Sequence, residues 1–168
     1  DAYQISGDPL FKQVARGIFQ YVLRDMTGEN GGFYSAEDAD SSISHENPEE
    51  HVEGAFYVWS HQELLEILGE NASLFSAYYG LREKGNVEED PFGEFAGKNH
   101  LSIVSTVQQV AAQLGLSSDE VEAGLEEGRR RLLDFRSQRP RPGLDDKILT
   151  DWNGLMISAL ARGYQVLQ

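Results

Sequence analysis

Apolar residues recur at intervals of three and four along most of the chain, which is the spacing of an amphipathic helix. The first such segment follows Asp8 and Pro9, a pair typical of a helix N-terminus, and its pattern ends near Gly28. We expect this helix to bury one face. Further segments with helical spacing lie at 61–68, 71–79, 105–114 and 117–136. Asn71 is expected to cap the second of these helices, and the core stripe of the last is expected to include Phe135. The pattern therefore predicts a mainly α-helical protein.

A last helix is predicted from Thr150 to the end of the chain, and it differs from the others because it is apolar nearly all round. No charged residue stands between Asp151 and Arg162. A helix of this kind is normally surrounded by other helices, and this chain supplies few of them. We therefore expect a piece of a longer protein that self-associates through its open helical end.

Two aromatic-rich segments, 32–35 and 54–60, have the composition of β-strands. We expect them to pair as a two-stranded hairpin. The segment that connects them, 36–53, is acidic and long for a turn, as is typical of functional loops. A second acidic stretch, 80–97, contains Pro91 and several glycines and is predicted to be a surface loop.

The charge and the missing cysteines exclude several classes of partner and chemistry. The 168 residues include 28 acidic and 14 basic side chains, a net charge of −14, so neither nucleic acid nor an anionic membrane is expected to bind. For the basic run Arg129–Arg131, continued by Arg136, Arg139 and Arg141, we expect an ion-paired, solvated face, with an anion patch as the alternative. The absence of cysteine excludes disulfides and favours a reducing, cytoplasmic compartment.

Four blocks of sequence, in order along the chain, resemble one family. They are Gly31–Ser41 (GGFYSAEDADS), Glu53–Ser60 (EGAFYVWS), Gly97–Leu101 (GKNHL) and Arg139–Leu155 (RPRPGLDDKILTDWNGL). These blocks are similar to the central region of the spermatogenesis-associated, thioredoxin-domain-containing proteins. The resemblance implies a thioredoxin-like domain followed by an (α/α)6 toroid of the six-hairpin glycosidase type. Residues 1–168 would be a single fragment, an early arc of that toroid with a small β-hairpin insertion.

Six charged residues within the resembling blocks are candidate catalytic groups, provided that the two segments that carry them meet at one rim. They are Glu37, Asp38 and Asp40 in the first segment and Asp145, Asp146 and Lys147 in the second. Glycoside hydrolysis needs one protonated and one ionised carboxyl group, and sugar epimerisation needs acid–base groups on opposite faces of one carbon. Crowding of carboxylates is expected to raise the pKa of one of them, which suits a general acid.

Aromatic side chains near these segments are candidate platforms for a sugar ring. Tyr34, Trp59 and Trp152 would contact a carbohydrate ligand, together with Asn153. Structural roles are the alternative, because acidic loops also cap helix ends and aromatic residues also pack in cores. The alternative function is a non-catalytic interaction scaffold attached to a thioredoxin-like redox domain.

No cofactor or metal is expected. The chain has neither a glycine-rich dinucleotide pattern nor a Walker pattern. Residues from Asp38 to Glu49 place oxygen atoms at several positions of a calcium loop, but Ile43 stands where that loop requires glycine. The four histidines have no ligand spacing on a common helix.

Overall fold

The computed structural model describes residues 1–87, 93 and 95–167, which form two compact units. The first unit contains Asp1–Asp38 and Gly143–Gln168, and the second contains Ala39–Pro142. Helices predominate in both, so the mainly α-helical prediction is confirmed. The acidic loop predicted at 80–97 lies partly outside the described residues.

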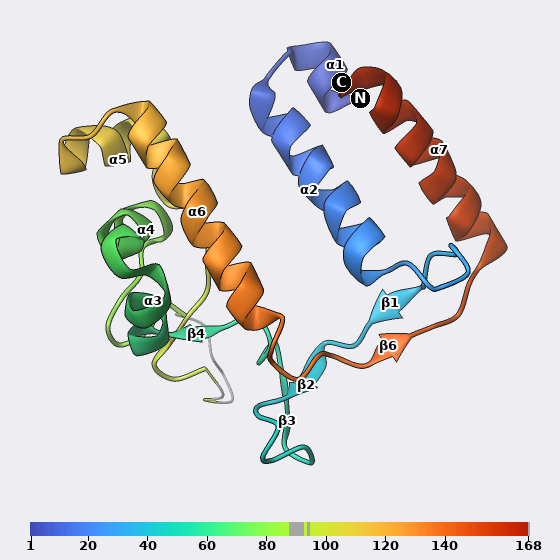
Figure 1. Ribbon diagram of the computed structural model, residues 1–168, viewed down its shortest axis with the longest axis horizontal. Coiled ribbons are helices and arrows are strands. Elements are labelled where there is room, and N and C mark those ends of the chain that lie inside the picture. Colours follow the sequence, from blue (N-terminus) through green and yellow to red (C-terminus); the bar gives the residue numbers. More distant parts are fainter. Residues whose placement is uncertain (88–92, 94, 168) are drawn as a thin grey trace. The chain divides into compact units, whose positions relative to one another are not determined.

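The first unit is built around two antiparallel helices (Figure 1). α2 (Pro9–Asp25) begins as predicted, with the Asp8 carboxylate accepting a backbone N–H of its first turn. α7 (Thr150–Val166) runs beside α2. The two helices approach closely at Gly163, where an added Cβ would lie 2.3 Å from the Phe19 ring. A side chain at position 163 would therefore push them apart.

Short elements complete this unit. α1 (Ala2–Ser6), which the sequence did not predict, precedes α2, and β1 (Ala36–Glu37) pairs antiparallel with β6 (Leu144–Asp145). Among the described residues of the unit, the buried large apolar side chains are Val22 and Met26. The helix face predicted to be buried is instead largely exposed, at Phe11, Val14, Ile18 and Leu23.

The second unit is a cluster of helices with two pairs of short strands. Its helical elements are α3 (His61–Leu68), the 3-10 turn η1 (Gly69–Asn71), α4 (Ala72–Tyr79), α5 (Val107–Leu114) and α6 (Ser118–Arg136). Its described strands are β2 (Asp40–Ser42), which pairs with β3 (His51–Glu53), and β4 (Trp59–Ser60), which pairs with β5 (Lys98–Asn99).

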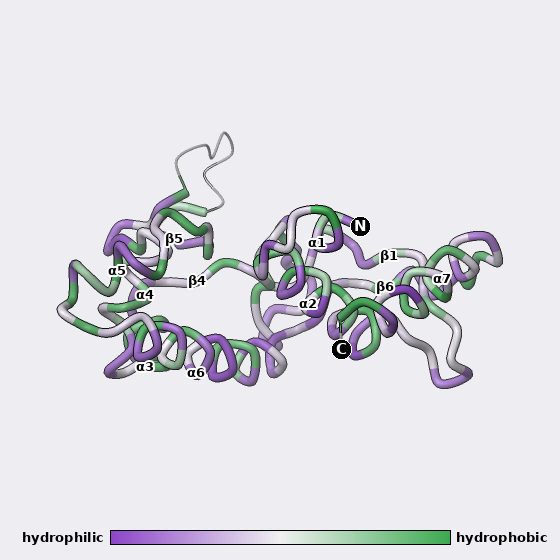
Figure 2. The backbone as a smooth tube through the Cα atoms, turned by 90° about the horizontal axis from the view of Figure 1, so that it is seen from above, coloured by the Kyte–Doolittle hydropathy of each residue, from purple (hydrophilic) through white to green (hydrophobic). Residues whose placement is uncertain are grey.

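Local sequence signals determine where the helices of the second unit begin. α3, α5 and α6 each start with a capping box, in which a Ser or Thr hydroxyl and a Glu or Gln three residues later bind each other's backbone N–H groups. Hydrophobic and hydrophilic residues follow one another along α6 (Figure 2). Its apolar face joins one buried cluster, which includes Trp59, Leu64, Leu68, Phe75, Val110, Val121, Leu125 and Leu132.

The predicted hairpin between 32–35 and 54–60 is wrong. Phe33 forms a bridge with Thr27, in the first unit, while β4 pairs with β5. The hairpin that forms is β2–β3, inside the segment predicted to be a connecting loop. Aromatic composition indicates that a segment can be a strand, but it does not specify the partner, which depends on hydrogen bonds between distant segments.

Three smaller predictions also need correction. Asn71 precedes α4 without a side-chain cap hydrogen bond, and Leu149, not Thr150, is the N-cap residue of α7. Phe135, predicted to be in the core stripe of α6, is 40% exposed.

The ion-paired face predicted for the basic run is confirmed at Arg130 and Arg131, which both bind Glu127. No described helix combines the length and apolarity needed to cross a bilayer.

Candidate functional site

The ribbon β1–β6 joins the two acidic segments of the first unit. Ala36 lies opposite Asp145, and Glu37 lies opposite Leu144. The ribbon continues on both sides, because the Ser35 N–H donates to the Asp145 carbonyl at 3.1 Å and the Asp38 N–H donates to the Gly143 carbonyl at 2.7 Å. Two segments that are distant in sequence are thus held side by side by backbone hydrogen bonds.

The register of the ribbon separates its carboxylates into two groups. Directly opposed residues share a face of an antiparallel pair, and successive residues alternate between faces. Asp145 therefore shares a face with Ala36 and, two residues further, with Asp38. Glu37 projects from the other face. The Cβ atoms of Asp38 and Asp145 are diagonal neighbours, roughly 7 Å apart in regular strand geometry.

Asp145 is held as an ionised group by its neighbours. The Lys147 ammonium lies 2.6 Å from Asp145 Oδ1. That hydrogen bond, with a smaller contribution from the Ser35 hydroxyl, lowers the pKa of Asp145 below its usual value. The pKa of Asp145 is therefore lowered, whereas crowding of acidic groups was predicted to raise the pKa of one carboxyl group in these segments.

Glu37 has a partner that sequence reasoning did not identify. The hydroxyl of Tyr21, on α2, donates to Glu37 Oε2 at 2.5 Å. Tyr21 looks in the sequence like one more member of the apolar face of α2, and no local pattern indicates that its hydroxyl reaches the ribbon. The hydrogen bond ties the last turns of α2 to β1 and fixes the direction of the Glu37 carboxylate.

A cavity of about 230 Å³ lies beside the ribbon, between α2, the segment 33–35 and the start of α7. Tyr21, Tyr34, Ser35, Trp152 and Asn153 are among its lining residues. Three residues predicted to contact a substrate are therefore gathered in one place. The Trp152 side chain is half-exposed, so part of its ring is open to a ligand.

The side chain of Asn153 hydrogen-bonds to the backbone at the wall of this cavity. Its side-chain oxygen accepts the Phe33 N–H at 2.8 Å, and its amide nitrogen donates to the Phe33 and Leu149 carbonyls at 2.9 and 3.0 Å. These three hydrogen bonds anchor the segment 32–35 to the first turn of α7. Asn153 thus positions the wall that carries Tyr34.

The remaining predicted residues are not part of this arrangement. Asp40, in β2, and Trp59, in β4, belong to the second unit. Trp59 is 1% exposed, with the Arg139 guanidinium 4.0 Å from its ring centroid, so it packs in the core as the structural alternative proposed. Asp146 is exposed and has no hydrogen bond or ion pair within the described part of the chain.

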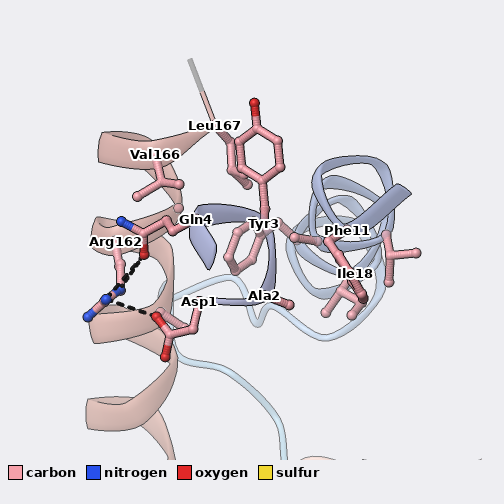
Figure 3. A pocket seen from close by; sticks show the side chains of 14 residues that line it. Asp1, Ala2, Tyr3, Gln4, Phe11, Ile18, Arg162, Val166 and Leu167 are labelled. Atoms are coloured by element: carbon pink, nitrogen blue, oxygen red, sulfur yellow. Dashed lines mark hydrogen bonds and ion pairs between the residues drawn. The ribbon is translucent and has the colours of Figure 1, made fainter. Parts of the chain in front are cut away.

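The first unit has a second, larger cavity at the other end of its helices. It measures about 350 Å³ and is lined mostly by apolar residues of α1, α2 and α7 (Figure 3). At its edge the Arg162 guanidinium contacts Asp1 at 2.9 Å and Gln4 at 3.2 Å. This cavity offers one ion pair and no group of converging carboxylates, so it is a weaker candidate for catalysis. No cluster of three or more potential metal ligands occurs among the residues described.

The fold and the ribbon define a mainly helical protein with acidic residues gathered on a small β-ribbon. No family model matches the chain. It is 41% identical over 172 residues to spermatogenesis-associated protein 20 of Homo sapiens and 42% identical to the protein of that name from Mus musculus, in both cases over 95% of this chain. An uncharacterized protein of Caenorhabditis elegans is 39% identical over 94% of the chain.

These similarities support the resemblance of the four sequence blocks to spermatogenesis-associated proteins. The chain spans 22% of the length of each of these relatives.

Proposed function

We propose that the full-length protein acts on carbohydrates and that the ribbon β1–β6 carries its acid–base pair. In this proposal α2 and α7 belong to an (α/α)6 toroid, and the ribbon lies on its rim. The observation that carries the proposal is the register of the ribbon, with Asp38 and Asp145 on one face. Inverting glycoside hydrolysis uses two carboxyl groups about 6.5–9.5 Å apart with a water molecule between them, and two aspartates at diagonal positions on one face can reach a separation of this order.

The surroundings of Asp145 support a division of roles. Its lowered pKa keeps this carboxylate ionised at neutral pH, as a general base that activates water must be. Asp38 would be the general acid that protonates the leaving oxygen. Glu37 would orient the ribbon through its hydrogen bond with Tyr21 and would not touch the substrate.

The cavity beside the ribbon supports carbohydrate as the ligand. Sugar rings present flat apolar faces that stack on aromatic side chains, and the exposed part of Trp152 offers such a surface, with Tyr34 nearby. The cavity itself is smaller than a typical ligand pocket of about 300–1,000 Å³. It would therefore hold one sugar ring, with the remaining subsites supplied elsewhere in the full-length protein.

Asp38→Asn and Asp145→Asn substitutions in the full-length protein test this proposal. Each is expected to reduce glycoside hydrolysis at least ~100-fold, the usual contribution of a general acid or base. Glu29→Gln is the matched control, because Glu29 is exposed in the turn after α2 and remote from the ribbon register. Release of reducing sugar from a panel of oligosaccharides is the measurement. Hydrolysis unchanged by both Asp substitutions would reject the assignment.

Epimerisation by the same residues is distinguished by product. An epimerase would incorporate solvent deuterium at one sugar carbon without releasing a reducing end, because it removes and returns a proton at carbon. Mass spectrometry of the sugar after incubation in heavy water separates the two reactions.

A second candidate function is an interaction scaffold attached to a thioredoxin-like domain. It is favoured by the exposure of large apolar residues along α7, namely Trp152, Leu155, Ile157 and Tyr164. Light scattering on the 168-residue chain tests the simplest form of this idea, self-association through α7. A Leu155→Lys, Ile157→Lys variant is expected to be a monomer where the parent chain is a dimer or larger. A parent chain that is already monomeric would contradict it.

A further inference from the structure

The second unit contains a cavity of about 400 Å³ that the carbohydrate proposal does not use. It is lined by residues of the β2–β3 hairpin, the start of α3, β5 and the end of α6. Phe56, Phe95 and Phe135 contribute apolar surface, and Glu63, Lys98 and Arg139 contribute charge. Its volume lies within the usual range for small-molecule pockets.

Arg139 is fixed in the wall of this cavity. Its Nη1 donates to the carbonyls of Phe56 and Val58 at 2.9 and 2.8 Å, and its Nη2 donates to Glu63 Oε1 at 3.1 Å. The guanidinium also stacks over the Trp59 ring. A guanidinium has five N–H donors. Three are occupied by these partners, so two remain for another acceptor.

Both oxygen atoms of the Glu63 carboxylate accept hydrogen bonds. Its Oε1 accepts from Arg139, and its Oε2 accepts from the Ser60 backbone N–H and hydroxyl at 2.8 Å each. Burial would raise the pKa of Glu63, but the hydrogen bonds from Ser60 and the charge of Arg139 lower it further than burial raises it. Glu63 therefore stays ionised and balances one positive charge.

Lys98 supplies a second positive charge, which acts on the Glu63 carboxylate and helps to lower its pKa. Its backbone pairs with Ser60 in the β4–β5 pair. No hydrogen bond or ion pair of its ammonium group occurs among the described residues. The cavity thus holds two cations against one carboxylate. In a chain with a net charge of −14, such an excess of positive charge is unusual.

Two more guanidinium groups lie near the apolar wall. Arg136 and Arg141 are 5.4 and 5.8 Å from the centroid of the Phe56 ring. Both contacts are cation–π interactions with the aromatic wall.

We propose that this cavity binds a small organic anion, a phosphate or carboxylate carried on a flat apolar body. The anionic group would bind Lys98 and the two free donors of Arg139, and the body would lie against Phe135 and Phe56. Carboxylate and phosphate share this chemistry, since both accept charge-assisted hydrogen bonds from a guanidinium and an ammonium. The site is independent of the acid–base pair on the first unit.

Calorimetric titration of the 168-residue chain with phenyl phosphate tests the proposal, with phenol and inorganic phosphate as separate arms. Phenyl phosphate is expected to bind at least tenfold more tightly than either, because phenol lacks the anionic group and inorganic phosphate lacks the flat apolar body. Benzoate in a further arm shows whether the site prefers carboxylate or phosphate. Absence of phenyl phosphate binding at millimolar concentration would overturn the proposal.

Lys98→Gln is the decisive variant, and Lys84→Gln is its matched control on the same unit. Lys98→Gln is expected to weaken phenyl phosphate binding about tenfold, the loss of one charge-assisted hydrogen bond. Lys84 is exposed and does not line the cavity, so its substitution is expected to leave the affinity unchanged. Equal affinities of both variants would overturn the proposal.

Phe135→Leu provides a second line of evidence if Lys98→Gln is unstable. Phe135 is partly exposed, so its replacement is tolerated more easily than that of a core residue. The variant is expected to lose phenyl phosphate affinity severalfold while its weak binding of inorganic phosphate stays unchanged. An unchanged affinity for phenyl phosphate would contradict the role assigned to the aromatic wall.

Discussion

The two units of this protein are stabilised in different ways. The second unit buries one continuous apolar cluster, from Trp59 through Phe75 to Leu132, and starts three of its helices with capping boxes. The first unit buries Val22 and Met26 and exposes large apolar residues along α2 and α7. Its order depends on hydrogen bonds between distant segments, such as those of Asn153 with Phe33.

The difference shows which sequence features specify the structure of each unit. The capping boxes of the second unit are specified by residues three positions apart, and the apolar spacing along each of its helices is local too, although the core that these helices form joins distant segments. The ribbon of the first unit is specified by pairs of residues that are distant in sequence. The apolar faces of α2 and α7 are largely exposed within this unit. The proposed acid–base pair therefore lies on the unit that has the smaller buried apolar core.

The largest expected effect comes from Phe75→Ala. Phe75 is fully buried in the second unit, so its truncation should lower the free energy of unfolding by about 3–5 kcal/mol. Phe11→Ala, on the exposed face of α2, is the control and should cost about 1 kcal/mol or less. Denaturant titration followed by circular dichroism measures both. Equal losses would show that the two units do not differ as described.

Asn153→Ala tests the other half of the comparison. Three hydrogen bonds to backbone atoms are lost, and leaving such groups without partners costs about 1–3 kcal/mol. Hydrogen exchange should become faster at the amides of 32–37, while amides of α6 keep their protection. Asn30→Ala, at an exposed turn of the same unit, should change neither. Faster exchange throughout α6 would mean that the units unfold together.

Much of the second unit could be predicted from the sequence, and much of the first could not. The Ser60–Glu63 and Ser117–Glu120 boxes are local, so α3 and α6 begin as predicted. The pairing of 36–37 with 144–145 involves distant segments, so the sequence allowed their meeting at one rim only as a condition for the candidate site. The Tyr21–Glu37 hydrogen bond has no sequence signal, because a tyrosine on an apolar helix face is usually a packing residue.

Acid should weaken the second unit through Glu63. The pKa of Glu63 is lowered in the folded state, so the stabilisation from this group is present above its unfolded-state pKa of about 4.3 and is lost as the pH falls through its folded value. Glu63→Gln should cost about 1–2 kcal/mol at pH 7, because Arg139 loses its carboxylate. The stability of the variant should also decrease less than that of the parent chain as the pH falls below 4. Thermal denaturation from pH 3 to pH 7 checks this, and a variant that follows the parent curve in parallel would contradict the assigned role.

The smallest expected effect is a gain, from giving α7 the cap that it lacks. Leu149 is the N-cap residue of α7 and makes no side-chain cap hydrogen bond, whereas Ser60, Thr106 and Ser117 cap helices of the second unit. Leu149→Ser keeps the backbone carbonyl that accepts from Asn153 and adds a hydroxyl that can accept an orphan N–H of the first turn. A Ser cap is worth about 0.5–1 kcal/mol, and its benefit should appear as slower hydrogen exchange in the first turns of α7. Leu149→Ala removes the same side chain without adding an acceptor, so it separates the cap from the loss of the leucine. If both variants exchange alike, the first unit is limited by its uncovered apolar faces and not by its helix ends.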